Sequence, residues 1–171
     1  MDEKSQIDGA VFLSASVTLR AADVPSLQRR AELLKTEANP MKNVPMGARG
    51  EAQQVVKFEH TLTAHHPQLP PVYSTPDMIR LMEIAAFHAL RTFCEGDEIT
   101  VGTAINVEHR AASGIGAKVW AEAVVESFDG RFYTVRVSAR DDVREIGRGT
   151  VGRAVVSVRK FMEKIKKESG E

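Results

Sequence analysis

Cysteine is nearly absent from this sequence, which has only Cys94 among its 171 residues. A single cysteine excludes a disulfide within the chain and a zinc site built on cysteines. We interpret Cys94 as a partly buried residue with no chemical role. Because chains without disulfides are typical of reducing compartments, and because the acidic, polar first ten residues do not resemble a secretory signal, we expect a cytoplasmic protein.

Net charge is also absent, because 23 basic residues balance 23 acidic ones. This balance does not favour binding to nucleic acid or to an anionic membrane surface. No apolar run approaches the roughly 20 residues that a membrane-spanning helix needs. We therefore expect neither nucleic acid nor a membrane among the partners of the protein.

What is present is the composition of an ordinary globular protein, with 43% hydrophobic and 27% charged residues. The length suits one domain that carries an additional arm. A strand at 11–20 and a helix at 22–39 are predicted, followed by a proline- and glycine-rich linker at 40–51. We therefore expect an N-terminal extension over 1–48, folded or partly disordered, and one domain over 49–171.

The domain is predicted to contain one long helix among strands. The helix is expected at 76–95, after a proline-rich loop at 65–72, and Gly96 is expected to end it. The predicted strands lie at 52–64, 99–110, 117–128, 131–141 and 144–161, with an Asp-Gly hairpin at 129–130 and a short, fraying helix at the C-terminus. A single helix against a meandering antiparallel sheet is an α+β arrangement, in which the sheet must wrap the helix.

The helical stretch "YSTPDMIRLMEIAAFHAL" contains an unexpected carboxylate. Thr75 is expected to cap the helix, with Pro76 at its first position. At about 100° per residue, Glu83 lies at the centre of an apolar stripe. The stripe consists of Ile79, Ala86, Phe87 and Leu90. A buried, unpaired carboxylate is costly, so Glu83 is either satisfied by a structural partner or serves as a general base or nucleophile.

A histidine occupies a similar position on the strand that follows. Alternation in "VGTAINVEHR" places His109 at the end of a mostly apolar row that contains Val101, Thr103, Ile105 and Val107. Taken alone, His109 is explained by a core histidine with a satisfied ring, and Thr75 is explained by helix capping. These two residues become informative only in combination with Glu83.

The segments "STPDMIRLMEIAA", "TVGTAINVEHRA" and "IGRGTVGRAVVSVRKF" together resemble the hotdog-fold thioesterases of the fluoroacetyl-CoA thioesterase-like family. The resemblance covers about residues 50–165. The family motif has a Thr before Pro at the helix start, a Glu eight residues later and a His 26 residues further on. In this sequence those positions are Thr75, Glu83 and His109.

The resemblance implies a hotdog fold, in which an antiparallel sheet wraps one long helix. It also implies a homodimer or a dimer of dimers whose sheets join edge to edge, which would cover exposed strand edges. An acyl-CoA would lie near the subunit interface, with coenzyme A as part of the substrate and no separate cofactor or metal. The implied function is hydrolysis of a small or medium acyl-CoA thioester, and the alternative is a regulatory module that binds acyl-CoA without hydrolysing it.

The resemblance also implies catalytic roles for the three motif residues. Glu83 would either attack the thioester carbonyl, giving a mixed anhydride, or deprotonate a water, and burial is expected to raise its pKa toward the working pH. Thr75 would hydrogen-bond the carboxylate or the carbonyl. His109 would position the water or protonate the leaving thiolate.

Three further residues are expected at the substrate. Tyr73 is a bulky aromatic in the loop nearest the acyl group, and Gly102 would let that group pass close to the strand backbone. Arg153, in the glycine-rich run that also supplies Gly149, would meet a phosphate of coenzyme A or else form a salt bridge on the sheet.

Three other functions fit the sequence less well. A hotdog hydratase resembles a pattern with Asp and His five residues apart on a helix, whereas Glu83 and His88 diverge by about 140°. A metal site would have to use His60, His65 and His66, without cysteines or suitable spacing. An interaction protein would use residues 1–48 as its binding arm. In a thioesterase, the same residues would be a lid, a dimer arm or the product of a translation start upstream of Met41 or Met46.

Overall fold

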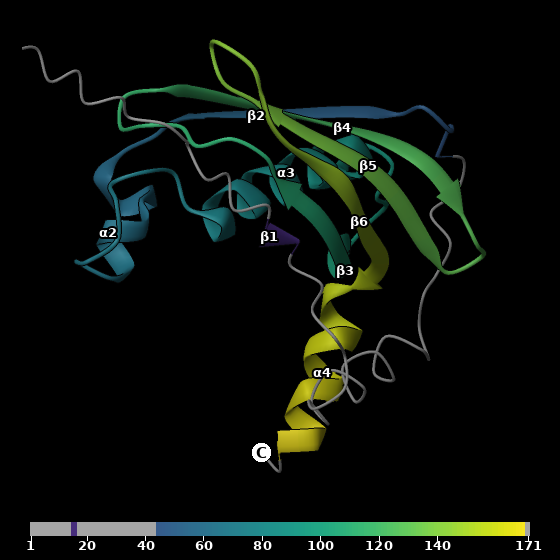
Figure 1. Cartoon of the computed structure of the whole chain (residues 1–171). Helices are drawn as coiled ribbons and strands as arrows, with labels where there is room; N and C mark the ends of the chain where they lie inside the picture. The colour runs from purple at the N-terminus through teal and green to yellow at the C-terminus, as the bar shows by residue number, and fades with distance from the viewer. Residues whose placement is uncertain (1–14, 17–43, 170–171) are drawn as a thin grey trace, which may run out of the picture.

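The computed structural model describes residues 15–16 and 44–169, and in this part of the chain a six-stranded antiparallel sheet curves around one long helix (Figure 1). The strand order is β1-β3-β6-β5-β4-β2. The strands are β1 (Ala15–Ser16), β2 (Arg49–Val55), β3 (Glu98–His109), β4 (Lys118–Phe128), β5 (Phe132–Arg140) and β6 (Glu145–Ser157). The helices are η1 (Phe58–His60), α2 (Leu62–His65), α3 (Thr75–Arg91) and α4 (Val158–Ser169). The expected hotdog architecture is confirmed.

Alternation of side chains along the strands builds the core. In β4 and β5 every second residue is buried against α3, and the residues between them face away from the helix. The buried positions are Val119, Ala121, Ala123, Val125, Tyr133, Val135, Val137 and Ala139. Small side chains at several of these positions let the sheet approach the helix closely, which explains how a single layer of strands can enclose α3.

The packing of α3 on β2 is especially close. A Cβ atom added at Gly50 would overlap the backbone of Ala85 and Ala89, with only 2.8 Å to the Cα atom of Ala89. No side chain larger than hydrogen therefore fits at this crossing. The buried face of α3 is centred on Met82 and consists of Met78, Leu81, Met82, Ala85, Ala86, Ala89 and Leu90.

The start of α3 differs by one residue from the prediction. Ser74, not Thr75, is the N-cap, because its hydroxyl oxygen accepts a hydrogen bond from the amide of Asp77 at 3.2 Å. The same hydroxyl donates to the Asp77 carboxylate at 2.7 Å. Thr75 is consequently the first helical residue, and its hydroxyl serves a different contact.

Other element bounds also differ from the prediction. β2 ends at Val55, and the predicted strand gives way to η1 and α2, where the Thr61 hydroxyl accepts from the amide of Ala64 at 3.3 Å. Helix α3 ends at Arg91, so Gly96, with φ of 55°, lies in the later turn rather than at the helix end. β6 ends at Ser157 because this residue and Asp97 bind the first amides of α4.

The N-terminal extension is described at β1, within the strand predicted at 11–20, and at its last residues, 44–48, where the carbonyl of Ala48 accepts from the amide of Val125 at 2.9 Å. Ala15 pairs with His109 and Ser16 with Glu108, so β1 lies against the end of β3. The predicted helix at 22–39 and the last residues of the fraying C-terminus, 170–171, lie outside the described residues. The division of the chain at residue 48 stays a prediction.

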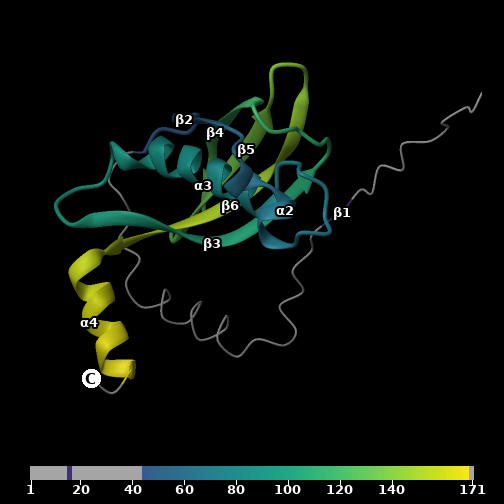
Figure 2. The ribbon, with the colours of Figure 1, turned by 90° about the vertical axis from the view of Figure 1, so that its left-hand side faces the viewer.

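The two ends of α3 have different neighbours. Figure 2 shows α2 beside the start of α3, where Thr61 and Tyr73 form a β-bridge. Helix α4 extends from the end of β6 (Figures 1 and 2), and Phe161 packs against Ala154 and Val156 on the outer face of the sheet. No helix in the described part of the chain is long and apolar enough to cross a membrane.

Candidate functional site

Thr75 and His109 are in direct contact. The Thr75 hydroxyl, at the first residue of α3, lies 2.9 Å from Nδ1 of His109, the last residue of β3. The other ring nitrogen, Nε2, lies 3.0 Å from the carbonyl oxygen of Ala111. A carbonyl can only accept, so the hydrogen-bond network assigns a proton to Nε2. In the neutral ring, Nδ1 is then the acceptor, and Thr75 donates its hydroxyl proton to it.

The surroundings of His109 favour the neutral ring. Burial lowers the pKa of His109 below its ordinary value, and the hydrogen bond to Ala111 opposes this shift only in part. His109 is therefore neutral at neutral pH and able to accept a proton. A hydroxyl that donates to a base, with the base oriented by a third group, is the arrangement of an activated nucleophile.

Glu83 belongs to a second group of residues. Its carboxylate lies 3.4 Å from Nη1 of Arg153, and the side chains of Glu83 and Arg153 are 31% and 6% exposed. The prediction that Glu83 occupies the centre of the buried stripe is wrong, because the buried face of α3 is centred on Met82, about 100° away around the helix. Glu83 lies at the border of that face, where partly exposed Ile79 and Phe87 accompany it.

Gly102 provides space for the Glu83 carboxylate. A Cβ atom added at Gly102 would overlap Oε1 of Glu83 and lie 3.1 Å from its carboxyl carbon. The space next to this glycine is therefore filled by Glu83, so the expectation that an acyl group passes here is not supported. The pairing of Gly102 with Arg153 between β3 and β6 brings all three residues together.

Arg153 is engaged inside the protein. Its guanidinium donates to the hydroxyl and carbonyl oxygens of Thr100, at 3.1 and 2.7 Å, and to the carbonyl of Glu83 at 3.4 Å. Burial lowers the pKa of Arg153, and the Glu83 carboxylate opposes this effect. The expected contact with a coenzyme A phosphate does not fit these partners. The alternative, a salt bridge on the sheet, fits in part, because Arg153 lies on β6 but its partner Glu83 lies on α3.

Tyr73 is likewise buried rather than presented to a substrate. Its hydroxyl donates to the carbonyl of Asp77 at 3.0 Å and accepts from the amide of Gln54 at 2.5 Å. Burial raises the pKa of Tyr73 well above its usual range. Tyr73 therefore anchors the segment that leads into α3, and its expected contact with the acyl group is not supported.

The structure brings the predicted residues into two groups rather than one. Thr75 and Glu83 are eight residues apart on α3, which corresponds to about 12 Å along the helix axis. Ile105, which is 36% exposed, lies between Gly102 and His109 on β3.

Sequence reasoning missed the group that orients the imidazole, because it is a backbone atom. The carbonyl of Ala111 carries no side-chain signal, and its position depends on how the chain turns after β3. It also missed the partnership of Arg153 with Glu83, which depends on the register between β3 and β6.

The described residues contain no group of three or more His, Cys, Asp and Glu side chains that could hold a metal ion.

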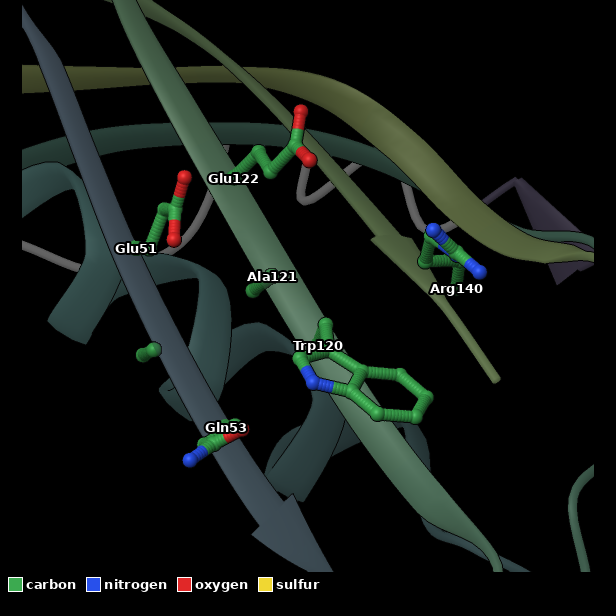
Figure 3. A pocket seen from close by; sticks show the side chains of 7 residues that line it. Glu51, Gln53, Trp120, Ala121, Glu122 and Arg140 are labelled. Atoms are coloured by element: carbon green, nitrogen blue, oxygen red, sulfur yellow. The ribbon is translucent and has the colours of Figure 1, made fainter. Parts of the chain in front are cut away.

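A groove lies on the outer face of the sheet, where strands lie in front of the helix in Figure 3. Its volume is about 400 Å³, and it is lined by Glu51, Ala52, Gln53, Trp120, Ala121, Glu122 and Arg140. The Arg140 guanidinium lies 5.5 Å from the centre of the Trp120 ring. None of the candidate catalytic residues lines this groove.

Comparisons with known proteins show the family to which the chain belongs. The model of the family described as fluoroacetyl-CoA-specific thioesterase matches residues 56–159, which include all the candidate residues. The fluoroacetyl-CoA thioesterase of Streptantibioticus cattleyicolor is 41% identical over 102 residues, covering 60% of this chain and 73% of that protein.

Solved structures agree with the sequence match. A structure of a fluoroacetyl-CoA thioesterase superposes with a TM-score of 0.69 at 36% identity, covering 74% of this chain and 98% of the other. A thioesterase-superfamily protein of Thermus thermophilus, at 24% identity, has a TM-score of 0.71 over 75% of this chain and 96% of its own, and supports the fold alone. The chain therefore belongs to the fluoroacetyl-CoA-specific thioesterase family, and it is a thioester hydrolase.

Proposed function

We propose that this chain hydrolyses the thioester of a small or medium acyl-CoA and that Thr75, Glu83 and His109 carry the reaction. The observation on which this rests is the hydrogen bond from Thr75 to the neutral His109 ring at 2.9 Å. A structure of a mutant relative in complex with fluoroacetate and CoA, 38% identical, with a TM-score of 0.62 over 68% of this chain and 98% of its own, supports coenzyme A as the thiol half of the substrate.

In the first step, the Thr75 oxygen attacks the thioester carbonyl carbon while its proton passes to Nδ1 of His109. Backbone amides at the start of α3 stabilise the negative oxygen that develops. The intermediate collapses, the carbon–sulfur bond breaks, and the thiolate takes the proton from His109. The acyl group remains as an ester on Thr75.

In the second step, water attacks this ester after losing a proton to Glu83. The acyl–oxygen bond breaks as the Thr75 oxygen takes the proton that Glu83 removed from water, so the carboxylic acid departs and both the Thr75 hydroxyl and the Glu83 carboxylate are restored. Arg153 holds the Glu83 carboxylate, and Gly102 leaves room for it. This assignment makes Glu83 a general base, as in other enzymes that activate water with a carboxylate.

The separation of about 12 Å along α3 supports a site in which a second copy of the chain supplies Glu83. In the described residues, the outer edge of β3 pairs only with the two residues of β1, and residues 102–106 are exposed. Antiparallel pairing of two such edges about a two-fold axis runs Gly102 of one strand toward the His109 end of the other. The homodimer would then combine Thr75 and His109 of one chain with Glu83 of its partner.

The first test is release of free thiol from short, branched, long and aromatic acyl-CoAs by wild type, Thr75→Ala, Glu83→Gln and His109→Asn. We expect turnover of one class by wild type and, for Glu83→Gln, an acyl adduct on the peptide that contains Thr75, detected by mass spectrometry. An adduct on Glu83 in the Thr75→Ala variant would reverse the two roles. Binding of acyl-CoA by wild type without any turnover would favour the regulatory module instead.

The shared site is tested by mixing two inactive variants. After subunit exchange, a dimer of one Glu83→Gln chain and one His109→Asn chain contains one intact site if the site spans two chains. The mixture should then regain about a quarter of wild-type activity, because half of the dimers are mixed and each has one intact site of two. As a control, a sample that contains only Glu83→Gln chains, treated in the same way, should regain no activity. No recovery in the mixed sample would mean that each site lies within one chain.

A further inference from the structure

The loop at 110–117, which joins β3 to β4, contacts both sides of the Thr75–His109 pair. The carbonyl of Ala111 accepts from Nε2 of His109 at 3.0 Å. Two residues later, the carbonyl of Ser113 accepts from the amide of Tyr73 at 2.8 Å. Tyr73 lies two residues before Thr75. A short stretch of backbone therefore aligns the base and the segment that presents the hydroxyl.

This stretch is fastened by a buried side-chain hydrogen bond. The Ser113 hydroxyl donates to Oδ2 of Asp141 at 2.7 Å, and both residues are buried. The other carboxylate oxygen of Asp141 accepts from the amides of Val143 and Arg144, each at 2.9 Å. Asp141 thus connects the turn between β5 and β6 to the loop after His109, 28 residues away in the sequence.

Because the Asp141 carboxylate is buried, its ionised form depends on these hydrogen-bond donors. Burial alone would raise the pKa of Asp141, but the Ser113 hydroxyl and the two amides together hold it below its ordinary value. Asp141 is therefore a charged acceptor at neutral pH, and hydrogen bonds to a charged acceptor are stronger than those between neutral groups. The loop is also held by Ile146, whose carbonyl accepts from the amides of Arg110 and Ala111 at 2.7 and 3.3 Å.

We propose that Ser113 and Asp141 are positioning residues for His109: their hydrogen bond holds the Ala111 carbonyl where it keeps the imidazole proton on Nε2. The inference rests on the proposed function, in which Nδ1 must accept the Thr75 proton. Without a fixed carbonyl, the ring also adopts the tautomer with a proton on Nδ1. That tautomer donates toward Thr75 and cannot accept its proton.

The experiment compares Asp141→Ala and Ser113→Ala with a matched control, Asp129→Ala. Asp129 accepts from the amides of Arg131 and Phe132, at 2.9 and 2.7 Å, in the hairpin between β4 and β5. Its removal therefore deletes the same type of turn contact as Asp141→Ala, at the opposite end of β5. Asp141→Asn is the conservative variant, because its amide oxygen can accept from the two backbone amides and its NH₂ group can donate to Ser113.

The first readout is the tautomer of His109, measured on the full chain by long-range ¹H–¹⁵N correlation of the ring nitrogens. We expect the Nε2–H form in wild type, Asp129→Ala and Asp141→Asn, and a mixture of both forms in Asp141→Ala and Ser113→Ala. An unchanged Nε2–H ring in the last two variants would overturn the inference. If Asp141→Ala does not fold, Ser113→Ala, which loses a single hydroxyl, decides the result.

The second readout is thiol release from an acyl-CoA that wild type hydrolyses. Asp141→Ala and Ser113→Ala should lower kcat by about tenfold or more while KM changes by less than about threefold, since binding does not use these residues. Asp129→Ala should leave both values near those of wild type. A kcat for Asp141→Ala equal to that of Asp129→Ala would contradict the positioning role. If wild type hydrolyses nothing but the tautomer shifts as expected, the proposed function fails and the positioning of His109 by this pair stands.

Discussion

The Thr75–His109 pair and the Glu83–Arg153 pair differ in their position in the fold and in their charge. The first joins the ends of two elements, the start of α3 and the end of β3, and both partners are neutral. The second joins the middle of α3 to the middle of β6, and both partners carry charge. Burial lowers the pKa of both His109 and Arg153, but only Arg153 has a carboxylate that opposes the shift. Breaking the neutral pair therefore leaves no buried charge without its partner, whereas breaking the charged pair links activity to stability.

The largest effect is expected from breaking the neutral pair. His109→Asn removes the proton acceptor for Thr75, and kcat should fall by about 10²–10⁴, the usual contribution of a general base. The free energy of unfolding should fall by no more than about 1–2 kcal/mol, since the two hydrogen bonds of the ring, to Thr75 and to Ala111, are both between neutral groups at a partly exposed site. Thiol-release kinetics and urea unfolding measure the two quantities. A variant that is fully active would remove His109 from the site.

Breaking the charged pair should lower both kcat and the free energy of unfolding. Glu83→Gln should lower kcat by about 10²-fold, and it leaves the buried Arg153 guanidinium without its counter-charge. We expect the free energy of unfolding to fall by about 1–3 kcal/mol, less than for a fully buried pair, because Glu83 is 31% exposed.

The matched control for this variant is Glu126→Gln on the outer face. Glu126 forms a salt bridge of 2.6 Å with Arg136, but both side chains are at least 40% exposed. Exposed salt bridges contribute about 0–1 kcal/mol, so the control should unfold almost as wild type does. Equal stability of Glu83→Gln and Glu126→Gln would show that the inner pair has no structural role.

A smaller effect is expected from Gly102→Ala, which tests how closely the carboxylate must be held. The added methyl group occupies the position of Glu83 Oε1, so the carboxylate has to move away from β3. We expect kcat to fall by about tenfold while the Thr75–His109 hydrogen bond is retained, because loss of orientation weakens catalysis without removing the groups. Kinetics together with a crystal structure of the variant would check both statements. Unchanged kcat with a displaced carboxylate would mean that the position of Glu83 does not matter.

The smallest effect concerns pH. Because the pKa of His109 lies below its ordinary value of about 6.5, the neutral ring persists below that pH, and protonation removes the base only as pH falls through the lowered pKa. The profile of kcat/KM should therefore be flat from pH 7 to about 6.5 and should decline at lower pH. An acid limb centred above pH 7 would contradict a buried, neutral His109.

The sequence predicted the fold better than the arrangement of the two groups. Spacing and resemblance pointed to Thr75 and His109, which are in contact. The helical wheel, however, placed Ile79 and Phe87 in the core, whereas the core face of α3 uses small residues such as Ala85 and Ala89. The role of Arg153 depended on a strand register that local patterns do not encode. Short helices such as α2 depend on a single cap at Thr61, which is a weak signal among strand-forming residues.

The crossing of β2 over α3 has a mechanical consequence for the chemistry. Gly50 touches the backbone of Ala85 and Ala89 so closely that the helix cannot turn about its own axis without a collision. Thr75 and Glu83 are carried on that same axis, so their directions relative to the sheet are set by a contact that neither residue makes. Attempts to alter substrate choice by directed evolution should therefore vary β3 and leave residue 50 unchanged. A side chain at residue 50 would displace α3 and misalign Thr75 and Glu83 together.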